Sequence, residues 1–243
     1  MEWKEELYAS YVSGGRAADS GKPASAHFAH RAPHIRRLID RRFPADRSIP
    51  VLDIGCGHGA LLYFLRQKGY SNVRGVDGSP EQVALAHRLG VEEVALGDGM
   101  GFLRQQESAS AGVVCLFDVL EHLTRPEAFE LITEIRRVLR PQGLLIGRAP
   151  NAQGIFGMSV RYGDLTHEQA FTSNSLPQML HSLGFTAVRC FEDRPAVHGL
   201  ASLMRLAVWV VGTIPFRLLV AAENGHLGGA VLTQNLLFTA RPA

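Results

Sequence analysis

Short apolar runs alternate with helix-like segments along residues 50 to 240, and this alternation limits the fold more than any other feature of the chain. Residues 111–118 (AGVVCLFD) are almost continuously apolar, which is typical of a central strand in a parallel sheet. Residues 126–139 instead place their apolar side chains on one helical face. The pattern predicts strands at 50–55, 72–77, 92–98, 111–118, 144–149, 184–192 and 231–240, and helices at 59–68, 80–89, 100–106, 126–139 and 174–183. We therefore predict an α/β fold, a seven-stranded Rossmann-like doubly wound sheet with helices on both faces.

The composition is that of a globular protein, because 46% of the residues are apolar and 20% are charged. The formal net charge of +2 is too small to indicate nucleic acid as the main partner, so we expect none. Cys56, Cys115 and Cys190 are too widely spaced for a disulfide framework or a cysteine zinc site. The N-terminal residues MEWKEELYAS lack the apolar core of a secretory signal, and we expect a cytoplasmic protein.

Acidic residues follow the ends of the first four predicted strands. They are Asp53, Asp77, Asp98 and Asp118, the last of which is followed by Glu121 and His122. Ligands of doubly wound sheets bind outside the carboxyl ends of the strands, so these side chains are expected to share one crevice. Asp77 at the end of the second strand would accept hydrogen bonds from both hydroxyls of a ribose, and Asp98 from an adenine amine.

Residues 55–60 form a glycine loop that satisfies the pattern G-x-G-x-x-A of dinucleotide-binding proteins. An NAD-binding oxidoreductase is therefore one alternative. The negative charge of Asp53 lies two residues before the first glycine and would face a bound pyrophosphate, and the chain has no second glycine fingerprint. The same charge suits a ligand that carries an ammonium group and a sulfonium, which the loop would then bind.

The loop and the strand ends together resemble a class I S-adenosylmethionine-dependent methyltransferase. The resemblance rests on VLDIGCGHG (51–59), Asp77, GDG (97–99), FDVLEHL (117–123) and RRVLRPQGLLI (136–146). Gln142 departs from it, since a glycine is more usual at that turn. The resemblance implies that S-adenosylmethionine is the cofactor and S-adenosylhomocysteine the product. It implies a cofactor site made of Tyr11, Asp53, Gly55, Cys56, Gly57, Asp77, Gly78, Asp98, Gly99, Met100, Phe117, Asp118 and His122.

The resemblance also assigns each part of the cofactor to particular residues, by their position in these motifs. The methionine moiety would lie against Asp53, Gly55 and Gly57, and the adenine near Asp98 and Gly99. Phe117 and Asp118 would line the methyl-donor pocket, and Tyr11 would fold over the cofactor. A protein that keeps the cofactor pocket without turnover remains an alternative.

Candidate catalytic groups lie at His122 and in the loop RYGDLTHEQAFT (161–172), where His167 and Glu168 are adjacent. Either histidine would act as general base toward an acceptor hydroxyl. The plainer alternatives are a helix-start role for His122 and a capping box made by Thr166 and Gln169. A metal ion bound by Asp164 and His167 would lack a third ligand, so we predict no metal site.

The N-terminal residues 1–47 are expected to form a lid and covering helices, and residues 48–243 the methyltransferase domain. His27, His30 and His34 would share one face of a helix over 25–43, although Pro33 would distort it. We favour a covering helix with Phe28, Ile35 and Ile39 turned inward.

An apolar helical insertion is expected at 199–223, before the last strand. Three uses of this segment remain open: a packed helical hairpin or dimer surface, a cap over an apolar acceptor, and a monotopic membrane contact through 200–222. The uninterrupted apolar run 206–216, bounded by Pro215 and Arg217, is too short to span a bilayer.

Residues 161–172, within the acceptor-side loop 151–173, resemble the corresponding loop of methyltransferases from bacterial cell-surface glycan pathways. We therefore expect O-methylation of a glycan or a lipid-linked sugar, by a cytoplasmic enzyme that contacts the inner face of the membrane or forms a homodimer. The alternative acceptor is a quinone or another small metabolite.

Overall fold

The computed structural model describes residue 7, residues 21–225 and residues 229–243. In chain order its elements are α2 (Ala24–His27), α3 (Ala32–Arg42), β1 (Val51–Ile54), α4 (Ala60–Gln67), β2 (Val73–Asp77), α5 (Pro80–Arg88), β3 (Val94–Leu96), α6 (Gly99–Arg104), β4 (Ala111–Phe117), the 3-10 helix η1 (Leu120–His122), α7 (Arg125–Val138), β5 (Leu139–Pro150), α8 (Gly157–Arg161), α9 (Ser175–Ser182), β6 (Phe185–Glu192), α10 (Leu200–Gly212), α11 (Ile214–Asn224) and β7 (Asn235–Pro242). The predicted alternation of strands and helices is confirmed.

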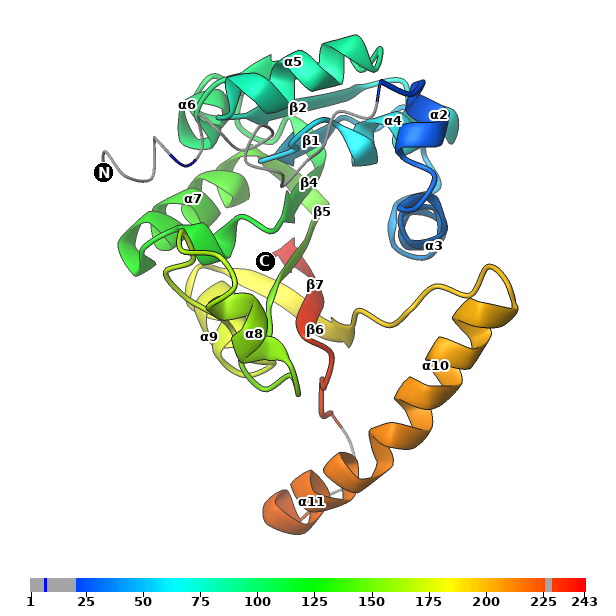
Figure 1. Ribbon diagram of the computed structural model, residues 1–243. Helices are drawn as coiled ribbons and strands as arrows, with labels where there is room; N and C mark the ends of the chain where they lie inside the picture. The colour runs from blue at the N-terminus through cyan, green and yellow to red at the C-terminus, as the bar shows by residue number, and fades with distance from the viewer. Residues whose placement is uncertain (1–6, 8–20, 226–228) are drawn as a thin grey trace.

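The strands form one seven-stranded sheet in the order β3-β2-β1-β4-β5-β7-β6 (Figure 1). Strands β1 to β5 pair in parallel, and β7 runs antiparallel to both β5 and β6. The strand order reverses between β1 and β4. The loops after these two strands therefore diverge from a crevice at the carboxyl edge of the sheet, where such folds bind their ligands.

Helices cover both faces of the sheet, as predicted, because alternate residues of each central strand point to opposite sides. Leu52 and Ile54 pack with side chains of α6, α7 and α9, whereas Val51 packs with α3, α4 and α5. In β4 the same division separates Val114 from Val113. This two-sided burial explains why residues 111–117 are almost entirely apolar.

Three predicted strands differ from the observed ones by two or more residues at an end. The last strand begins at Asn235 instead of 231, because the buried Asn151 side chain donates to the carbonyls of Val231 (2.7 Å) and Thr233 (2.8 Å). These two carbonyls are thereby withdrawn from strand pairing. β5 begins earlier than predicted, at Leu139, and β3 is confined to Val94–Leu96.

The single covering helix predicted over 25–43 is wrong, because α2 and α3 are separate helices. Pro33 occupies the first turn of α3, a position that suits its fixed φ and its missing N–H. The three histidines therefore do not share one helical face. Phe28 lies in the break between the helices and is completely buried, and Ile39 is also buried, as predicted. Tyr11 lies outside the described residues.

The apolar insertion forms α10 and α11, which we call the apolar rod (residues 200–224). Figure 1 shows α11 continuing away from the end of α10 after a bend instead of folding back on it, with both helices apart from the sheet and its covering helices. A packed hairpin is therefore wrong. The helical segment is longer than the apolar run 206–216 that is too short to span a bilayer, because Pro215 lies in the first turn of α11 and does not end the segment. By length and composition alone, these 25 residues are long and apolar enough to cross a membrane.

Candidate active site

The loop after β1 is held in a conformation that requires glycine. Gly55, Gly57 and Gly59 have φ angles of +69°, +55° and +78°, in the left-handed region where side chains are unfavourable. A Cβ atom at Gly55 would lie 2.5 Å from Cγ2 of Val119, so the neighbouring chain leaves no space for one. The backbone of the loop can therefore approach a ligand closely.

Asp77, at the end of β2, fixes this loop. Its Oδ2 accepts a hydrogen bond from the backbone N–H of Gly57 at 2.7 Å, and its Oδ1 accepts one from Ser79 at 2.9 Å. Burial raises the pKa of Asp77, although both hydrogen bonds act in the opposite direction. Each carboxylate oxygen has a second lone pair, so the side chain retains acceptor capacity toward a ribose.

Asp53 is the most deeply buried acidic group beside the loop, with 3% of its surface exposed. Burial, followed by the nearby charge of Asp77, raises the pKa of Asp53 to about 8. A carboxyl group in this environment becomes a carboxylate most easily when a cation lies against it. The ammonium group and the sulfonium of S-adenosylmethionine are cations of the required size and sign.

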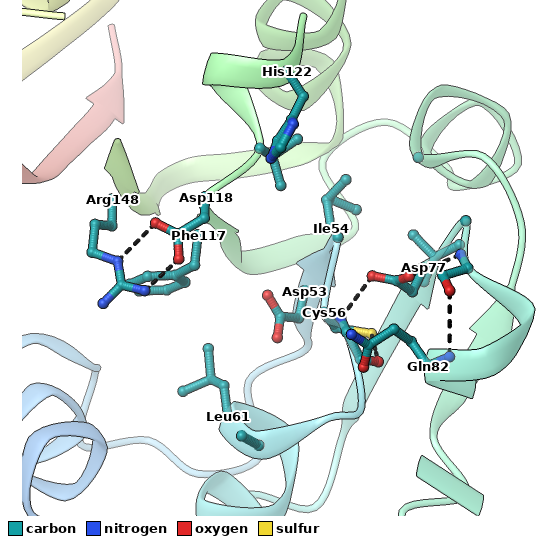
Figure 2. Close-up of a pocket in the computed structure, with 18 of the residues that line it drawn as sticks. Asp53, Ile54, Cys56, Leu61, Asp77, Gln82, Phe117, Asp118, His122 and Arg148 are labelled. Carbon is teal, nitrogen blue, oxygen red and sulfur yellow. Dashed lines mark hydrogen bonds and ion pairs between the residues drawn. The ribbon is translucent and has the colours of Figure 1, made fainter. Parts of the chain in front are cut away.

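These residues surround a cavity of about 850 Å³ (Figure 2). All the predicted cofactor residues that the structure describes line it: Asp53, Gly55, Cys56, Gly57, Asp77, Gly78, Asp98, Gly99, Met100, Phe117, Asp118 and His122. Asp98 also caps α6 by accepting from the N–H of Gly101 at 2.7 Å. The strand ends therefore converge on one crevice, as predicted. Their individual roles stay predictions.

Asp118 makes a contact that the sequence analysis missed. Figure 2 shows its carboxylate turned toward Arg148 of β5, whose Nε donates to Oδ1 at 2.8 Å. Burial alone would raise the pKa of Asp118, but the guanidinium of Arg148 outweighs this effect and holds the pKa below its usual range. Nη1 of Arg148 also lies 3.4 Å from Oδ2 of Asp193, and Oδ1 of Asp193 lies 3.2 Å from Nε2 of His34. An arginine inside the apolar run LLIGRA was the available signal for such a half-buried ion pair.

The predicted catalytic histidines are neighbours. The rings of His122 and His167 have their centroids 4.7 Å apart in an edge-to-face arrangement. The loop that carries His167 is fixed to η1, because the backbone N–H of Glu168 donates to the carbonyl of Glu121 at 2.6 Å. His122 lines the cavity, whereas His167 does not.

The carboxyl groups in this region are not arranged as the sequence suggested. Glu168, the predicted catalytic partner of His167, is exposed, whereas Glu121 is buried beside the two histidines. Burial, followed by the charge of Asp118, raises the pKa of Glu121 well above its usual range. The signal that could have found it was its place in DVLEH, directly before His122.

The capping box that was one alternative for Thr166 and Gln169 is absent from the described residues. Thr166 donates instead to Asp164 through both its backbone N–H (2.9 Å) and its hydroxyl (2.7 Å). Gln169 donates to the carbonyls of Leu120 (3.2 Å) and Leu123 (3.0 Å). These bonds attach the acceptor-side loop to the end of the fourth strand, so they replace the helix start that a capping box requires.

Residues 27–189 match the protein-family model described as "Methyltransferase domain". The chain belongs to this methyltransferase family. Among curated proteins, it is 30% identical over 124 residues to human EEF1A lysine methyltransferase 2, covering 46% of this chain and 51% of the relative. It is also 30% identical over 113 residues to the putative methyltransferase YqeM of Bacillus subtilis, covering 42% and 44%. The chain thus spans about half the length of these curated relatives.

Solved structures support the same fold. An S-adenosylmethionine-dependent methyltransferase from Archaeoglobus fulgidus superposes with a TM-score of 0.66 at 21% identity, covering 87% of this chain and 94% of that one. Phosphoethanolamine N-methyltransferase 2 of Haemonchus contortus, solved with S-adenosylhomocysteine, gives a TM-score of 0.60 at 19% identity, covering 86% and 52%. At 21% and 19% identity, these two structures show that the fold is shared.

The family match supports a methyltransferase and not an NAD-dependent oxidoreductase. Two solved structures of similar fold contain S-adenosylhomocysteine or S-adenosylmethionine. The cavity fits this cofactor because it presents a buried carboxyl group to a cation and a glycine backbone to the amino-acid part. When bound, the cofactor supplies an activated methyl group on a sulfonium. The enzyme's own task is to hold the acceptor in line with the methyl and sulfur atoms, and such orientation can lower a barrier by about 7–11 kcal/mol in ideal models.

Proposed function

We propose that this methyltransferase O-methylates a glycan or a lipid-linked sugar at the cytoplasmic face of a membrane. The apolar rod carries the proposal. Only 6% of its most apolar stretch is buried. Its exposed large side chains are Leu200, Leu203, Met204, Val208, Val210, Val211, Ile214, Phe216, Leu218 and Leu219. A helix that is apolar on all sides is normally covered by protein or by lipid.

Contacts of Arg217 favour a rod that lies on the membrane over one that crosses it. Arg217, in α11, pairs with Glu192 at the end of β6 at 2.5 Å and donates to the carbonyl of Ala230 at 3.1 Å. A rod spanning the bilayer would draw this ion pair and the sheet edge into hydrocarbon, which is costly. An interfacial position lets the apolar side chains enter the lipid while Arg217 stays beside the sheet.

The rod is connected to the wall of the cofactor cavity. The segment that leads into α10 begins at Asp193, whose carboxylate contacts the cavity-lining Arg148. Arg37 of α3 fixes the same segment by donating to the carbonyl of Pro195 at 3.0 Å. An acceptor anchored in the lipid under the rod would therefore reach the methyl donor from the side where this segment starts.

The choice of oxygen as the methyl acceptor rests on the histidines. His122 lines the cavity and is in ring contact with His167, so the pair offers a base for a hydroxyl proton. General-base catalysis contributes typically a hundredfold or more to such a transfer. A quinone is the second candidate, because the same rod would place the enzyme beside a membrane-dissolved acceptor.

The first test measures transfer of a labelled methyl group from S-adenosylmethionine to membrane lipid extracts. We expect label in the organic phase that moves to the aqueous phase after mild acid hydrolysis, which releases sugars from lipid carriers. Label that stays in the organic phase after hydrolysis would favour the quinone. Transfer to soluble proteins alone would contradict both acceptors.

A second test concerns the membrane contact. The triple variant Leu203→Glu, Val208→Glu and Leu219→Glu changes three exposed positions of the rod. Each apolar side chain that enters lipid contributes roughly 1.5–3 kcal/mol, so binding to vesicles of phosphatidylcholine and phosphatidylglycerol should weaken by at least about a hundredfold. The matched control introduces the same charge at exposed positions of other helices and their ends, Gln105→Glu, Thr133→Glu and Gln178→Glu. Equal vesicle binding by both triple variants would contradict the proposal, and a concentration-dependent dimer without vesicle binding would assign the rod to a second copy.

A further inference from the structure

A buried carboxylate oxygen lies beside the two histidines without a hydrogen-bond partner. Glu121, in η1, has 2% of its surface exposed, and its Oε2 accepts no hydrogen bond from the residues that the structure describes. Leaving such a group unsatisfied in an apolar interior costs several kcal/mol, unless a cation or a proton compensates it. Glu121 is held in this place because its carbonyl accepts from the backbone of Glu168.

Both histidine rings are oriented by hydrogen bonds through Nδ1. His167 Nδ1 lies 3.0 Å from the carbonyl of Val160, which can only accept, so this nitrogen carries the proton. His122 Nδ1 lies 2.8 Å from the hydroxyl of Thr166, whose own proton goes to Asp164. Each ring is therefore held as the tautomer in which Nε2 has the lone pair. Such outer hydrogen bonds to a carbonyl or a carboxylate relay are characteristic of metal-binding histidines.

We propose that Glu121, His122 and His167 bind one divalent transition-metal ion beside the cofactor cavity. One ligand atom from each residue lies within 4.8 Å of the other two. Two imidazoles and one carboxylate form a donor set that suits zinc, manganese or iron and leaves coordination positions open. Glu121 and His122 lie in η1 and His167 in the acceptor-side loop, so the three ligands come from two distant segments of the chain.

The geometry requires a small contraction on binding. Ligand atoms at about 2.1 Å from a tetrahedral zinc ion are roughly 3.4 Å apart, so a separation of up to 4.8 Å must shorten by at most about 1.4 Å. Rotation of the Glu121 carboxylate and the His167 ring can supply this movement. The oxygen without a partner would gain its missing contact, and the loop would be joined more firmly to η1.

Resting on the proposed function, the ion would bind the acceptor hydroxyl at an open position. A metal-bound hydroxyl loses its proton near neutral pH far more easily than a free one, and the proton would pass to water. With their Nε2 atoms bound to the ion, His122 and His167 would act as ligands in place of the general base. The resulting oxygen forms a bond to the methyl carbon while the carbon–sulfur bond breaks, and its electron pair stays on sulfur. His122 connects the two sites, because it also lines the cofactor cavity.

Metal binding can be measured directly on the tag-free protein, without any acceptor. After removal of bound metal, Zn²⁺ or Mn²⁺ is titrated by calorimetry into the wild type, Glu121→Gln and His167→Ala. The matched control is His181→Ala, which removes an exposed histidine at the end of α9. We expect one ion per chain for the wild type and the control, and at least tenfold weaker binding for the two ligand variants. Each variant's melting temperature and S-adenosylhomocysteine affinity verify that it is folded.

A fourth variant tests the orientation of His122. Thr166→Val keeps the size of the side chain but removes the hydroxyl between His122 and Asp164, so metal affinity should fall by roughly tenfold or more. No ion bound by the wild type, or one bound equally well by Glu121→Gln and His167→Ala, would overturn the proposal. A metal that binds as expected in a protein that methylates no sugar would contradict only the proposed function.

Discussion

The predicted donor side and the predicted acceptor side of the site are constructed differently. On the donor side, carboxyl groups at strand ends hold a glycine loop that follows β1, as in the bond from Gly57 to Asp77, 20 positions apart. On the acceptor side the contacts join distant segments: His122 with Thr166, 44 positions apart, and Arg148 with Asp193, 45 positions apart. The donor side is therefore encoded in compact motifs, whereas the acceptor side exists only once the chain has folded.

The difference suggests that the two sides can be damaged separately. The glycines predicted to bind the cofactor are constrained by their surroundings. A Cβ atom at Gly55 would collide with Val119, and one at Gly99 would collide with Ile54. The acceptor side depends on side-chain hydrogen bonds that carry little backbone strain. A substitution on one side should thus leave the other side's ligand affinity almost unchanged.

The largest effect is expected from Asp77→Ala. The variant loses both the predicted ribose contacts and the bonds that hold the glycine loop, so S-adenosylhomocysteine affinity should fall by roughly thirtyfold or more, or about 2 kcal/mol. Calorimetric titration measures the change. Asp98→Ala is the comparison, since it removes a neighbouring strand-end carboxylate that caps α6 instead of holding the loop. Unchanged affinity in folded Asp77→Ala would contradict the ribose assignment.

His167→Ala tests the acceptor side. We expect turnover to fall by about tenfold or more, because a base or ligand at the acceptor is lost. S-adenosylhomocysteine affinity should stay within about twofold of the wild type, since His167 does not line the cofactor cavity. A variant that no longer binds the cofactor would show that the two sides are coupled through His122.

A smaller effect concerns pH. Because burial raises the pKa of Asp53 to about 8, this group is protonated in the free enzyme at neutral pH. A cationic ligand favours the carboxylate, so binding near pH 7 should release a proton, and affinity should decrease several-fold from pH 8 to pH 7. Calorimetry in buffers with different ionisation enthalpies counts the proton. Asp53→Asn should release none through this group, and a wild type that releases none would contradict the assignment.

Sequence reasoning reached the donor side because its signals are local. Strands, glycines and strand-end acids each leave a mark within a few residues, and together they fix the carboxyl edge of the sheet. The acceptor side gave no such signal. Adjacency in the chain to His167 favours Glu168, yet the fold buries Glu121 beside that histidine and leaves Glu168 exposed.

The same distinction explains the other misses. Arg148 pairs with Asp118 across neighbouring strands. Asn151 donates to the carbonyls of Val231 and Thr233, 80 and 82 positions along the chain, and so keeps them out of strand pairing. The sequence shows that the rod is apolar, but its exposure depends on whether the sheet and its covering helices pack against it. These features follow from long-range packing, which periodicity cannot report.

The smallest predicted effect is a change in stability at a turn that does not contact the cofactor. Gln142 has a φ of +66°, at the turn where the family resemblance favours glycine. Gln142→Gly should relieve roughly 1 kcal/mol of backbone strain, partly offset by the greater freedom of the unfolded chain, for a net gain of about 0.5 kcal/mol. Thermal unfolding should then shift upward by about 1–2 °C, with cofactor affinity unchanged. The control is Gln105→Gly, where φ is −79° and glycine should lower the melting temperature. If both variants lost stability equally, the left-handed turn would not be a source of strain, and the departure from the family pattern at this position would have no energetic consequence.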